Sequence, residues 1–325
     1  MTQGIPIKEV MVRQAVNGLE IFGSREEWLR NRPPHKVRLH ASHAATVVGL
    51  PGRSKFALNR RLRGLQEQPE LYNPEAAKWG LRLEAAILSA AAEEGEVEGF
   101  TFWDPGDAIV VHENGWMACS PDAFCWLRER EGLTGNCQVK TTTNFQRGQW
   151  DHEIPAHVYA QVQHEMLCLD VSYTVVLALI GGQDFRFAIV DRDDVWCTDY
   201  MTKATAFWSN ILADQDDDPD ASDECTRSIS SKYPAAMEGE SIILPVAFEQ
   251  VDEELEEAKA EIKKWTAKKK AAENLIKNAI GENELGILPA GVLYKWATTT
   301  RQAFTVKEST YRKLSRKKQR EFNDG

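Results

Sequence analysis

The sequence has no long apolar run and no apolar leader. Its longest uninterrupted apolar run covers residues 175–180, whereas a helix that crosses a bilayer needs about 20 such residues. Residues 1–14 mix charged and apolar side chains and lack the apolar core of a signal peptide. We therefore expect a cytoplasmic protein with no membrane partner.

Cysteine is sparse, and its spacing argues against the usual cysteine-based sites. The six cysteines include no Cys-x-x-Cys pair and form no short framework of the kind found in secreted domains. Such scattered residues are typical of free thiols in a reducing compartment. Disulfide bonds, a zinc site and an iron–sulfur cluster are therefore not expected.

Positive charge is scarce overall but concentrated in two segments. The 325-residue chain has a net charge of −10, which by itself argues against nucleic acid as a partner. Residues 24–63 nevertheless carry ten Lys/Arg and two Glu, and residues 301–320 carry eight Lys/Arg and one Glu. Residues 214–257 carry fifteen Asp/Glu and two Lys/Arg, and we expect this block to be a solvated face. An acidic chain with this segregation can still present a cationic groove to phosphates.

Apolar periodicity and turn residues predict an α+β domain before residue 215. Helices are expected at residues 24–31, 42–48, 55–65, 74–94, 155–169 and 193–212. Strands are expected at residues 108–112, 115–119, 123–127, 136–141, 171–180 and 185–190. The order is helices, a meander, a helix, two strands and a helix, which is typical of a domain of mixed α and β structure.

A polar, acidic stretch broken by Pro219 divides the chain near residue 215. We predict a domain at residues 1–214, an acidic linker and loop at 215–248, and an extension at 249–325. Apolar residues spaced by three and four from Val251 predict a long amphipathic helix in the extension, with Lys269 within its apolar stripe. We expect this helix to pack on its own domain, because a coiled coil between chains needs an unbroken apolar seam. A hairpin at 292–297 and 303–306 and a basic tail at 312–320 should follow.

Two short motifs bring oxygen ligands and a lysine to one edge of the predicted sheet. Asp122 follows Ser120 and Pro121 between two strands, and Lys140 comes two residues after Gln138 on a neighbouring strand. Residues two apart on a strand share a face. Carboxylate and carbonyl oxygens suit a hard cation such as Mg²⁺, and a nearby lysine can orient or deprotonate an attacking water. This geometry therefore suits a hard divalent cation, although an acid-x-lysine pair alone carries no signal, because such pairs are common on exposed strands. Glu84 adds a further acid on the long helix before these strands.

These motifs resemble the phage lambda exonuclease and YqaJ-like viral recombinase family of the PD-(D/E)xK nuclease superfamily. The resemblance covers roughly residues 24–211. The stretches that carry it are Trp28 to Arg32, Ala41-Ser42, Trp79-Gly80 with Glu84, Ser120-Pro121-Asp122, Val139-Lys140-Thr141, Ile154-Pro155-Ala156, Tyr159 to Gln163 and Phe207-Trp208. It implies a restriction-endonuclease-like core, in which a mixed central sheet is flanked by helices, with a C-terminal helix and hairpin extension.

The resemblance also implies roles for individual residues. Asp122 would be the central metal ligand, with Glu84 as a supporting acid and the Val139 carbonyl as a further ligand. Lys140 would activate the water, and Gln161 would position the nucleophile or the phosphate. One or two Mg²⁺ ions would serve, with Mn²⁺ as a substitute.

The implied substrate is the end of a DNA duplex. Arg32, Ser42 and Ser120 match positions that hold a terminal 5′-phosphate, a use suited to guanidinium and hydroxyl donors. The enzyme would degrade one strand of linear duplex DNA from 5′ to 3′ and leave 3′ single-stranded tails for recombination. A single-strand annealing protein and further copies of the chain in a ring-shaped oligomer are the implied partners, in a bacterial host that carries the gene on a phage or prophage.

Gln138 departs from the family pattern, which normally has Glu at this position. An amide oxygen is a neutral and weaker Mg²⁺ ligand than a carboxylate. Three interpretations stay open: a natural variant that still coordinates the metal, a Glu→Gln change made to trap a substrate complex, or a catalytically inactive binder. Glu165, one helical turn after Gln161, could supply a migrated carboxylate. The alternatives to an exonuclease are therefore a DNA-end-binding recombination protein and an endonuclease of the same superfamily.

Overall fold

The computed structural model describes residues 7–31, 37–67, 73–93, 95–130, 132–301, 303, 308 and 311–316. The chain forms two compact units, Met1–Tyr233 and Pro234–Gly325. All six cysteines are buried free thiols, as the sequence predicts. None of the described helices is long and apolar enough to cross a membrane.

Helices and strands alternate along the first unit. Its elements are α1 (Ile7–Ala15), β1 (Leu19–Ile21), α2 (Arg25–Arg30), β2 (Leu39–His40), the 3-10 helix η1 (Ala41–His43), α3 (Ala44–Val47), α4 (Lys55–Leu62), α5 (Pro74–Glu93), β3 (Thr101–Trp103), β4 (Ala108–Val111), β5 (Met117–Cys119), β6 (Ala123–Trp126), η2 (Arg128–Arg130), β7 (Gly135–Thr142), η3 (Asn144–Trp150), α6 (Ala156–Leu169), β8 (Tyr173–Ile180), β9 (Asp184–Asp191), α7 (Asp194–Leu212) and α8 (Asp223–Lys232).

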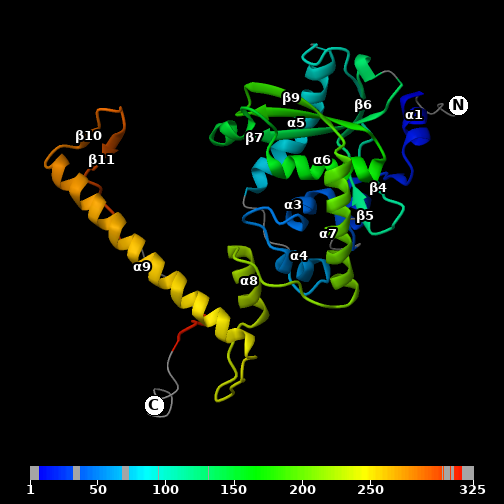
Figure 1. Ribbon diagram of the computed structural model, residues 1–325. Helices are drawn as coiled ribbons and strands as arrows, with labels where there is room; N and C mark the ends of the chain where they lie inside the picture. Colours follow the sequence, from blue (N-terminus) through cyan, green and yellow to red (C-terminus); the bar gives the residue numbers. More distant parts are fainter. Residues whose placement is uncertain are drawn as a thin grey trace. The chain divides into compact units, whose positions relative to one another are not determined.

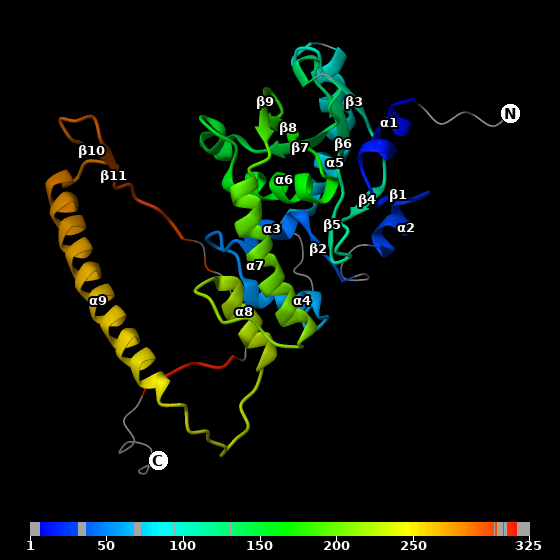
Figure 2. The ribbon, with the colours of Figure 1, turned by 45° about the vertical axis from the view of Figure 1, so that its right-hand side comes forward.

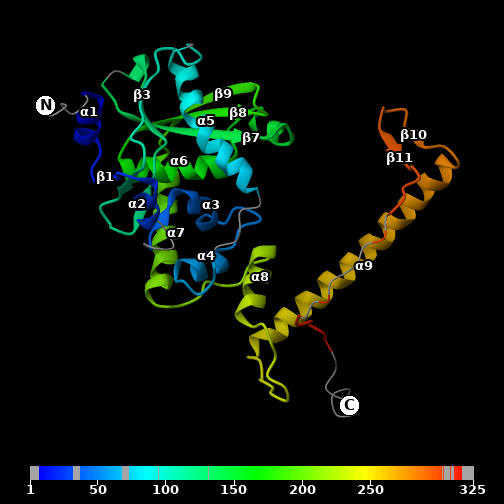
Figure 3. The same cartoon turned by 180° about the vertical axis from the view of Figure 1, so that it is seen from behind.

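A five-stranded mixed sheet forms the centre of the first unit. Its strand order is β3-β6-β7-β8-β9, in which β7 and β8 are parallel and the other neighbours are antiparallel. Val175 and Leu177 of β8 pack with Leu88 of α5, whereas Val176 between them packs with Val162 of α6. Figure 3 shows α5 lying across the sheet, and Figure 1 shows α6 on the other side. The predicted α+β class, with a mixed sheet flanked by helices, is confirmed.

A smaller sheet of order β1-β4-β5-β2 lies beside α6. Its strand β2 runs parallel to β5, with His40 opposite Ala118. His164 of α6 joins the two layers, because its Nε2 lies 3.1 Å from the Ala118 carbonyl oxygen and its Nδ1 lies 2.5 Å from the Tyr200 hydroxyl. The loop that follows β5 is therefore held where the two sheets meet.

Helix α5 approaches the sheet closely because of one glycine. The helix begins at Pro74, whose missing N–H costs nothing in the first turn, and Asn73 Oδ1 accepts the Ala76 N–H at 3.0 Å. At Gly80, an added Cβ would lie 3.1 Å from Thr141 Oγ1 of β7, which is tighter than ordinary van der Waals contact. The close approach brings Glu84, one turn later on α5, to the edge of β7.

The structure divides the chain after Tyr233, whereas the sequence places the boundary near residue 215. The acidic segment that we expected to be a solvated linker packs on the basic helix α4. Ser54 Oγ donates to Asp220 at 2.6 Å, Asn59 Nδ2 donates to Asp217 at 2.8 Å, and α8 lies against α4 (Figure 2). Charge neutralisation fixes this segment, so it belongs to the first unit.

The second unit contains one long helix and a hairpin. Helix α9 (Ala247–Ile280) is continuous, as predicted, and begins four residues before Val251. The hairpin differs from the prediction, because β11 (Leu293–Lys295) pairs with the preceding segment β10 (Leu285–Ile287). Residues 304–306 of the expected partner strand lie outside the described residues, as do residues 317–320 of the basic tail. The tail residue Arg316 forms a two-point ion pair with Asp252 of α9, with nitrogen-to-oxygen distances of 2.7 and 2.8 Å.

Arg63 should be important for the stability of the first unit. Its side chain is 9% exposed and donates to Asp214 at 2.6 Å, to Asp216 at 2.7 Å and to Asn59 at 3.0 Å. Arg63→Ala would remove the charged donor from Asp214 and Asn59, whereas Asp216 would keep Lys232 at 2.6 Å and Arg60 at 3.4 Å. We expect it to lower the free energy of unfolding by ~1–3 kcal/mol, because buried hydrogen-bond partners such as Asn59 are left unsatisfied. Arg30→Ala is the matched control, because Arg30 forms an exposed pair with Glu26 on α2 and should change stability by less than about 0.5 kcal/mol. Urea denaturation of both variants tests this prediction, which equal midpoints would contradict.

Candidate active site

Four elements supply the site that the sequence predicts. Asp122 lies in the loop between β5 and β6, and Gln138 lies on β7. Gln161 comes from α6, and Glu84 comes from α5. Together with Ser120, these residues line one cavity of about 390 Å³. The structure thus brings together residues that lie as much as 77 positions apart in the sequence.

Lys140 lies at an adjoining cavity of about 600 Å³, which it lines with Val139 and Glu84. Glu84 also lines the first cavity, so its carboxyl group connects the two. Along β7, Gln138 is buried and Lys140 is half-buried. The lysine is therefore near the predicted ligands, although it does not line the same cavity as Asp122.

The Asp122 carboxylate is bonded to β7 in two places. Its Oδ2 accepts the backbone N–H of Val139 at 2.7 Å and also accepts the side-chain amide N–H of Gln138. The Gln138 oxygen Oε1 accepts from Gln161 Nε2 at 3.1 Å. In this arrangement Gln138 presents N–H groups to Asp122, and its amide must rotate before its oxygen can join Asp122 at a cation.

The hydrogen-bonded chain continues into α6 and back to β7. Gln161 Nε2 also donates to Glu165 Oε1 at 2.8 Å, and Asn136 Nδ2 donates to Glu165 Oε2 at 2.7 Å. Glu165 is 1% exposed. Both of its oxygens are occupied by amide donors, so Glu165 orients Gln161 and does not reach the cavity in this state.

Two carboxyl groups near the cavity hold protons more tightly than usual. Burial and, to a smaller extent, the neighbouring charge of Asp122 together raise the pKa of Glu84 to about 7, against the opposing charge of Arg25. Burial also raises the pKa of Glu165 to about 7, and the charge of Lys140 opposes that rise. Between about pH 4.5 and 7 the folded chain binds more protons than the unfolded chain, so these two groups make the fold less stable as the pH rises through that range.

The three residues expected to hold a 5′-phosphate have different positions. Ser120 lines the cavity, and its buried Oγ has no hydrogen-bond partner among the described residues. Ser42 is exposed in η1. Strands β2 and β5 are parallel, with His40 opposite Ala118. Ser42 comes two residues after His40, and Ser120 comes two residues after Ala118, so both serines lie at the same edge of the smaller sheet. Arg32 lies outside the described residues.

Arg25 of α2 was not singled out by the sequence. It lines both cavities, donates to Asp107 at 2.9 Å, and lies over the Trp28 ring at 3.6 Å from the ring centre. The only sequence signal was its place in the basic segment 24–63, which does not distinguish it from the other nine cations there. Its guanidinium is a positively charged donor at this cavity, of the type that binds phosphate groups in proteins.

The donors at the cavity fit a cation that keeps much of its water. Among the described residues, no three His, Cys, Asp or Glu side chains are grouped as metal ligands. Asp122 and Glu84 instead supply two carboxylates beside the Val139 peptide. Mg²⁺ commonly takes one or two carboxylates and completes its six ligands with water and substrate phosphate, so the residues present are sufficient for such a site.

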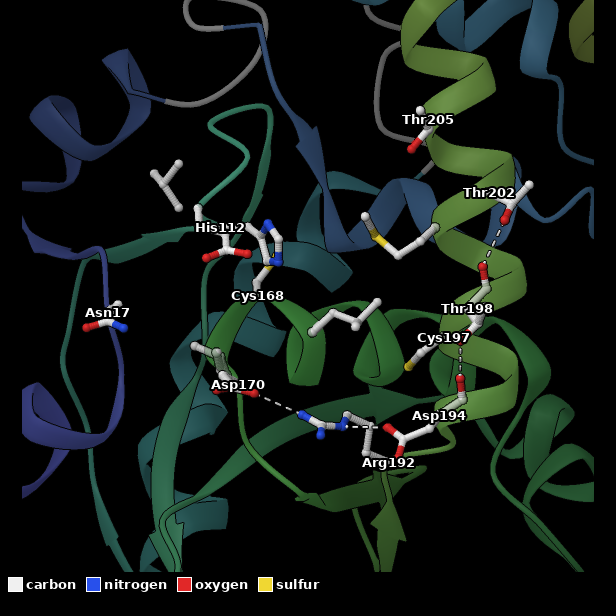
Figure 4. Close-up of a pocket in the computed structure, with 15 residues that line it drawn as sticks. Asn17, His112, Cys168, Asp170, Arg192, Asp194, Cys197, Thr198, Thr202 and Thr205 are labelled. Atoms are coloured by element: carbon white, nitrogen blue, oxygen red, sulfur yellow. Dashed lines mark hydrogen bonds and ion pairs between the residues drawn. The ribbon is translucent and has the colours of Figure 1, made fainter.

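A larger cavity of about 960 Å³ lies elsewhere in the first unit, beside α7. Figure 4 shows Arg192 between Asp170 and Asp194 in this cavity, with nitrogen-to-oxygen distances of 3.1 and 3.0 Å. Both acids neutralise the arginine, and the cavity shares no lining residue with the one at Asp122. This larger cavity is therefore not the predicted site.

A comparison with protein families identifies the part of the chain that contains the site. Residues 27–172 match the family model described as the YqaJ-like viral recombinase domain. This confirms the resemblance that the motifs indicate, and every site residue from Arg32 to Glu165 falls within the matched segment.

Several solved structures are similar to part of the chain. An alkaline exonuclease from Laribacter hongkongensis is 19% identical, with a TM-score of 0.46 over 58% of this chain and 93% of that one. Its complex with dAMP is 20% identical, with a TM-score of 0.45 over the same shares of 58% and 93%. A phage-related exonuclease from Haemophilus somnus 129PT is 10% identical, with a TM-score of 0.36 over 55% of this chain and 96% of that one. No curated protein matches the sequence.

Metal binding at this site should depend on pH through Glu84. Because the pKa of Glu84 is about 7, protons compete with the cation below that pH, and the affinity for Mn²⁺ should rise by up to about tenfold per pH unit between 6 and 7. Calorimetric titration of the metal at pH 6, 7 and 8 measures this slope. Glu84→Gln should flatten it, whereas Glu75→Gln, an exposed acid on the same helix, should not. An unchanged slope in Glu84→Gln would exclude Glu84 as a ligand.

Proposed function

We propose that this chain is a metal-dependent exonuclease that degrades one strand of linear duplex DNA from 5′ to 3′. The observation that carries the proposal is the meeting of Glu84, Asp122 and Gln138 at one cavity, with Lys140 at the adjoining one. The YqaJ-like viral recombinase domain around these residues supports a phage-type exonuclease. Mg²⁺ dependence and the direction of digestion are our finer proposals.

The residues that would hold one or two Mg²⁺ ions are Asp122, Glu84 and the Val139 carbonyl, joined by the Gln138 oxygen after rotation of its amide. Mn²⁺ offers the same preference for oxygen ligands and should substitute. When bound, the cation would lower the pKa of a water and neutralise charge that develops on the phosphate. The carboxylates of Asp122 and Glu84 would keep it at the edge of β7.

Lys140 would act on the attacking water. Its ammonium lies on β7 two residues from Gln138, and its charge acts on both Glu84 and Glu165. A lysine in this position can orient a water through its ammonium group. In its neutral amine form it can instead accept a proton from that water. Gln161, held by Glu165, would keep its amide directed at the ligand position and so restrict where the water or phosphate sits.

The end of the duplex would bind through its 5′-phosphate. Ser120 contributes a buried hydroxyl with no hydrogen-bond partner among the described residues, and Arg25 contributes a guanidinium at the same cavity. Ser42 and Arg32 would complete this pocket. Hydroxyl and guanidinium donors suit a terminal phosphate with two charges, and this supports digestion that begins at a 5′ end.

The products and partners follow from such a reaction. Removal of one strand leaves a 3′ single-stranded tail, and we propose that a single-strand annealing protein receives it during recombination. Additional copies of the chain would encircle the duplex. These roles place the protein in the cytoplasm of a bacterium that carries a phage or prophage.

A second candidate is a DNA-end-binding recombination protein without catalysis. The observation that favours it is the donor orientation of Gln138, which satisfies Asp122 by a hydrogen bond in place of a shared cation. A binder would keep the phosphate pocket and lose the hydrolysis. The two candidates therefore differ in turnover and not in the ends they recognise.

Linear and covalently closed duplex DNA, each incubated with Mg²⁺, test the proposed activity. An exonuclease consumes only the linear form, an endonuclease cuts both forms, and a binder shifts mobility without forming product. We expect Lys140→Ala to lower the rate on linear DNA by about 10²–10⁴-fold, because a positioned proton-transfer group is lost. Lys203→Ala on α7, whose lysine pairs with Asp199 at the surface, is the control and should retain full activity.

Strand-specific labels on the same linear duplex report the direction of digestion. Ends with a 5′-phosphate should be digested faster than ends with a 5′-hydroxyl. Equal rates on the two ends would remove the phosphate pocket, and cleavage of closed circles would replace the exonuclease with an endonuclease. Full activity of Lys140→Ala would exclude Lys140 from the reaction.

Gln138→Glu should strengthen the metal site. A carboxylate at this position adds a charged oxygen ligand, so strand degradation should reach its half-maximal rate at about tenfold lower Mg²⁺. Without metal the same change places a second negative charge against Asp122 and should lower thermal stability, which Mg²⁺ should then restore. Activity and melting temperature across a Mg²⁺ titration test both expectations.

Gln146→Glu is the matched control, because Gln146 is exposed in η3 and carries the same change of charge. An unchanged Mg²⁺ response in Gln138→Glu would show that position 138 is not a ligand. In that case, loss of activity in Glu165→Gln would point to Glu165 as the replacement carboxylate.

A further inference from the structure

Helix α9 has an apolar face that its own unit leaves uncovered. Of its 34 residues, all of which the structure describes, only Ile280 is buried. Phe248 is 47% exposed, Ile262 is 66% exposed and Trp265 is 56% exposed. At about 1.5 Å per residue the helix is about 50 Å long. Most helical stability in proteins comes from packing of an apolar face, so a helix of this kind indicates a partner.

The apolar face has the spacing of a coiled coil. Its positions recur at alternating intervals of three and four residues over the whole helix, which is the heptad period of 3.5. The ten positions are Phe248, Val251, Leu255, Ala258, Ile262, Trp265, Lys269, Ala272, Ile276 and Ala279. Nine of them are apolar, and Lys269 is the exception. This regular period favours another helix as the partner.

The charges of α9 are divided between its two halves. Residues 247–261 carry seven Asp/Glu and one Lys, whereas residues 262–280 carry six Lys and one Glu. Within one chain this division stabilises the helix, because acidic residues near its N-terminus and basic residues near its C-terminus interact favourably with the helix dipole. Two parallel copies would place each half beside a half of the same sign. Two antiparallel copies would place each acidic half beside a basic half. The charges would then be complementary along the whole interface.

We propose that α9 pairs with α9 of a second copy of this chain as an antiparallel coiled coil. In this pairing the two-fold axis lies midway along the ten positions. Ile262 then faces Trp265 of the second copy, and Leu255 faces its Ala272. The same register opposes Phe248 to Ala279 and Val251 to Ile276. The register gives five different pairs of facing side chains, and in three of them a large side chain faces an alanine. Side chains of unequal size let the two helices interdigitate at a constant separation.

Lys269 fits this register although it interrupts the apolar stripe. It faces Ala258 of the second copy, whose small side chain leaves room for the four-carbon lysine stem to extend to water. Two parallel copies would instead place Lys269 beside Lys269. The residue that argued against an intermolecular coiled coil in general therefore argues only against the parallel form.

The flanking positions agree with the antiparallel register at its centre. Glu261 lies opposite Lys268 of the second copy, and the two-fold axis repeats this pair. Farther out, Asp252 lies opposite Glu273, a pair of like charges. Arg316 of the same chain neutralises Asp252 through the ion pair with distances of 2.7 and 2.8 Å. The basic tail thus reduces the one repulsion that the register creates.

Cysteine cross-linking of the full chain tests the register. We would introduce Leu255→Cys in one preparation and Ala272→Cys in another, since the six native cysteines are buried. After mixing, subunit exchange and mild oxidation, the antiparallel pairing should give a cross-linked dimer on a non-reducing gel, and neither variant alone should give one. A dimer from Leu255→Cys alone would establish the parallel form and overturn the proposal, and so would the absence of any cross-link in the mixture.

Charge reversal tests the same interface without cysteines. Glu261→Lys or Lys268→Glu alone should weaken dimerisation by about tenfold in sedimentation or light-scattering measurements, whereas the double variant should restore it by exchanging the two charges. The control, Glu253→Lys, lies on the outer face of the helix and should have little effect. Equal self-association of all four variants and the parent chain would overturn the proposal. That result is also the one expected if α9 packs on the first unit of the same chain.

Discussion

The hydrogen bond from the Val139 N–H to Asp122 Oδ2, at 2.7 Å, anchors the site to the central sheet. It fixes the loop after β5 against β7, so that the carboxylate cannot rotate freely. From that carboxylate a line of amide groups runs through Gln138 and Gln161 to Glu165. Three elements far apart in the chain are therefore oriented by one polar network. Buried networks of this kind tolerate few changes, because each member leaves its neighbour unsatisfied when removed.

The network has an electrostatic cost that the sheet and helices must offset. Four acids, Glu84, Asp104, Asp107 and Asp122, line the cavity, and Glu165 joins the network through Gln161. Burial raises the pKa of Glu84 and of Glu165 to about 7. Partial protonation near neutral pH limits their mutual repulsion. Arg25 of α2 and Lys140 of β7 supply positive charge near Glu84. The acids of the site outnumber these two cations, so a bound metal ion would neutralise part of the remaining negative charge.

Sequence periodicity and turn residues were sufficient for most elements, including the short strands β4 and β6, and missed several elements that distant partners hold in place. The helix expected at 155–169 is α6, and the strand expected at 136–141 is β7, because both bury apolar residues at a regular period. Strand β1 has three residues and exists because β4, almost ninety residues later, pairs with it. Helix α8 is mostly polar and folds through its Ser222 cap and through the ion pair of its Glu224 with Arg61 of α4. Such elements depend on tertiary contacts that no local pattern contains.

The site shows the same division between local pattern and tertiary contact. Asp122, Gln138 and Lys140 could be found from spacing, since neighbouring strands bring them together. The orientation of the Gln138 amide could not, because it depends on which groups of Asp122 and Gln161 face it. A glutamate at position 138 would repel Asp122 until a cation separated them, whereas the amide bonds to both neighbours without one. The same substitution that weakens a metal ligand therefore stabilises the site in the absence of metal, and the strength of cation binding depends on how readily that amide rotates.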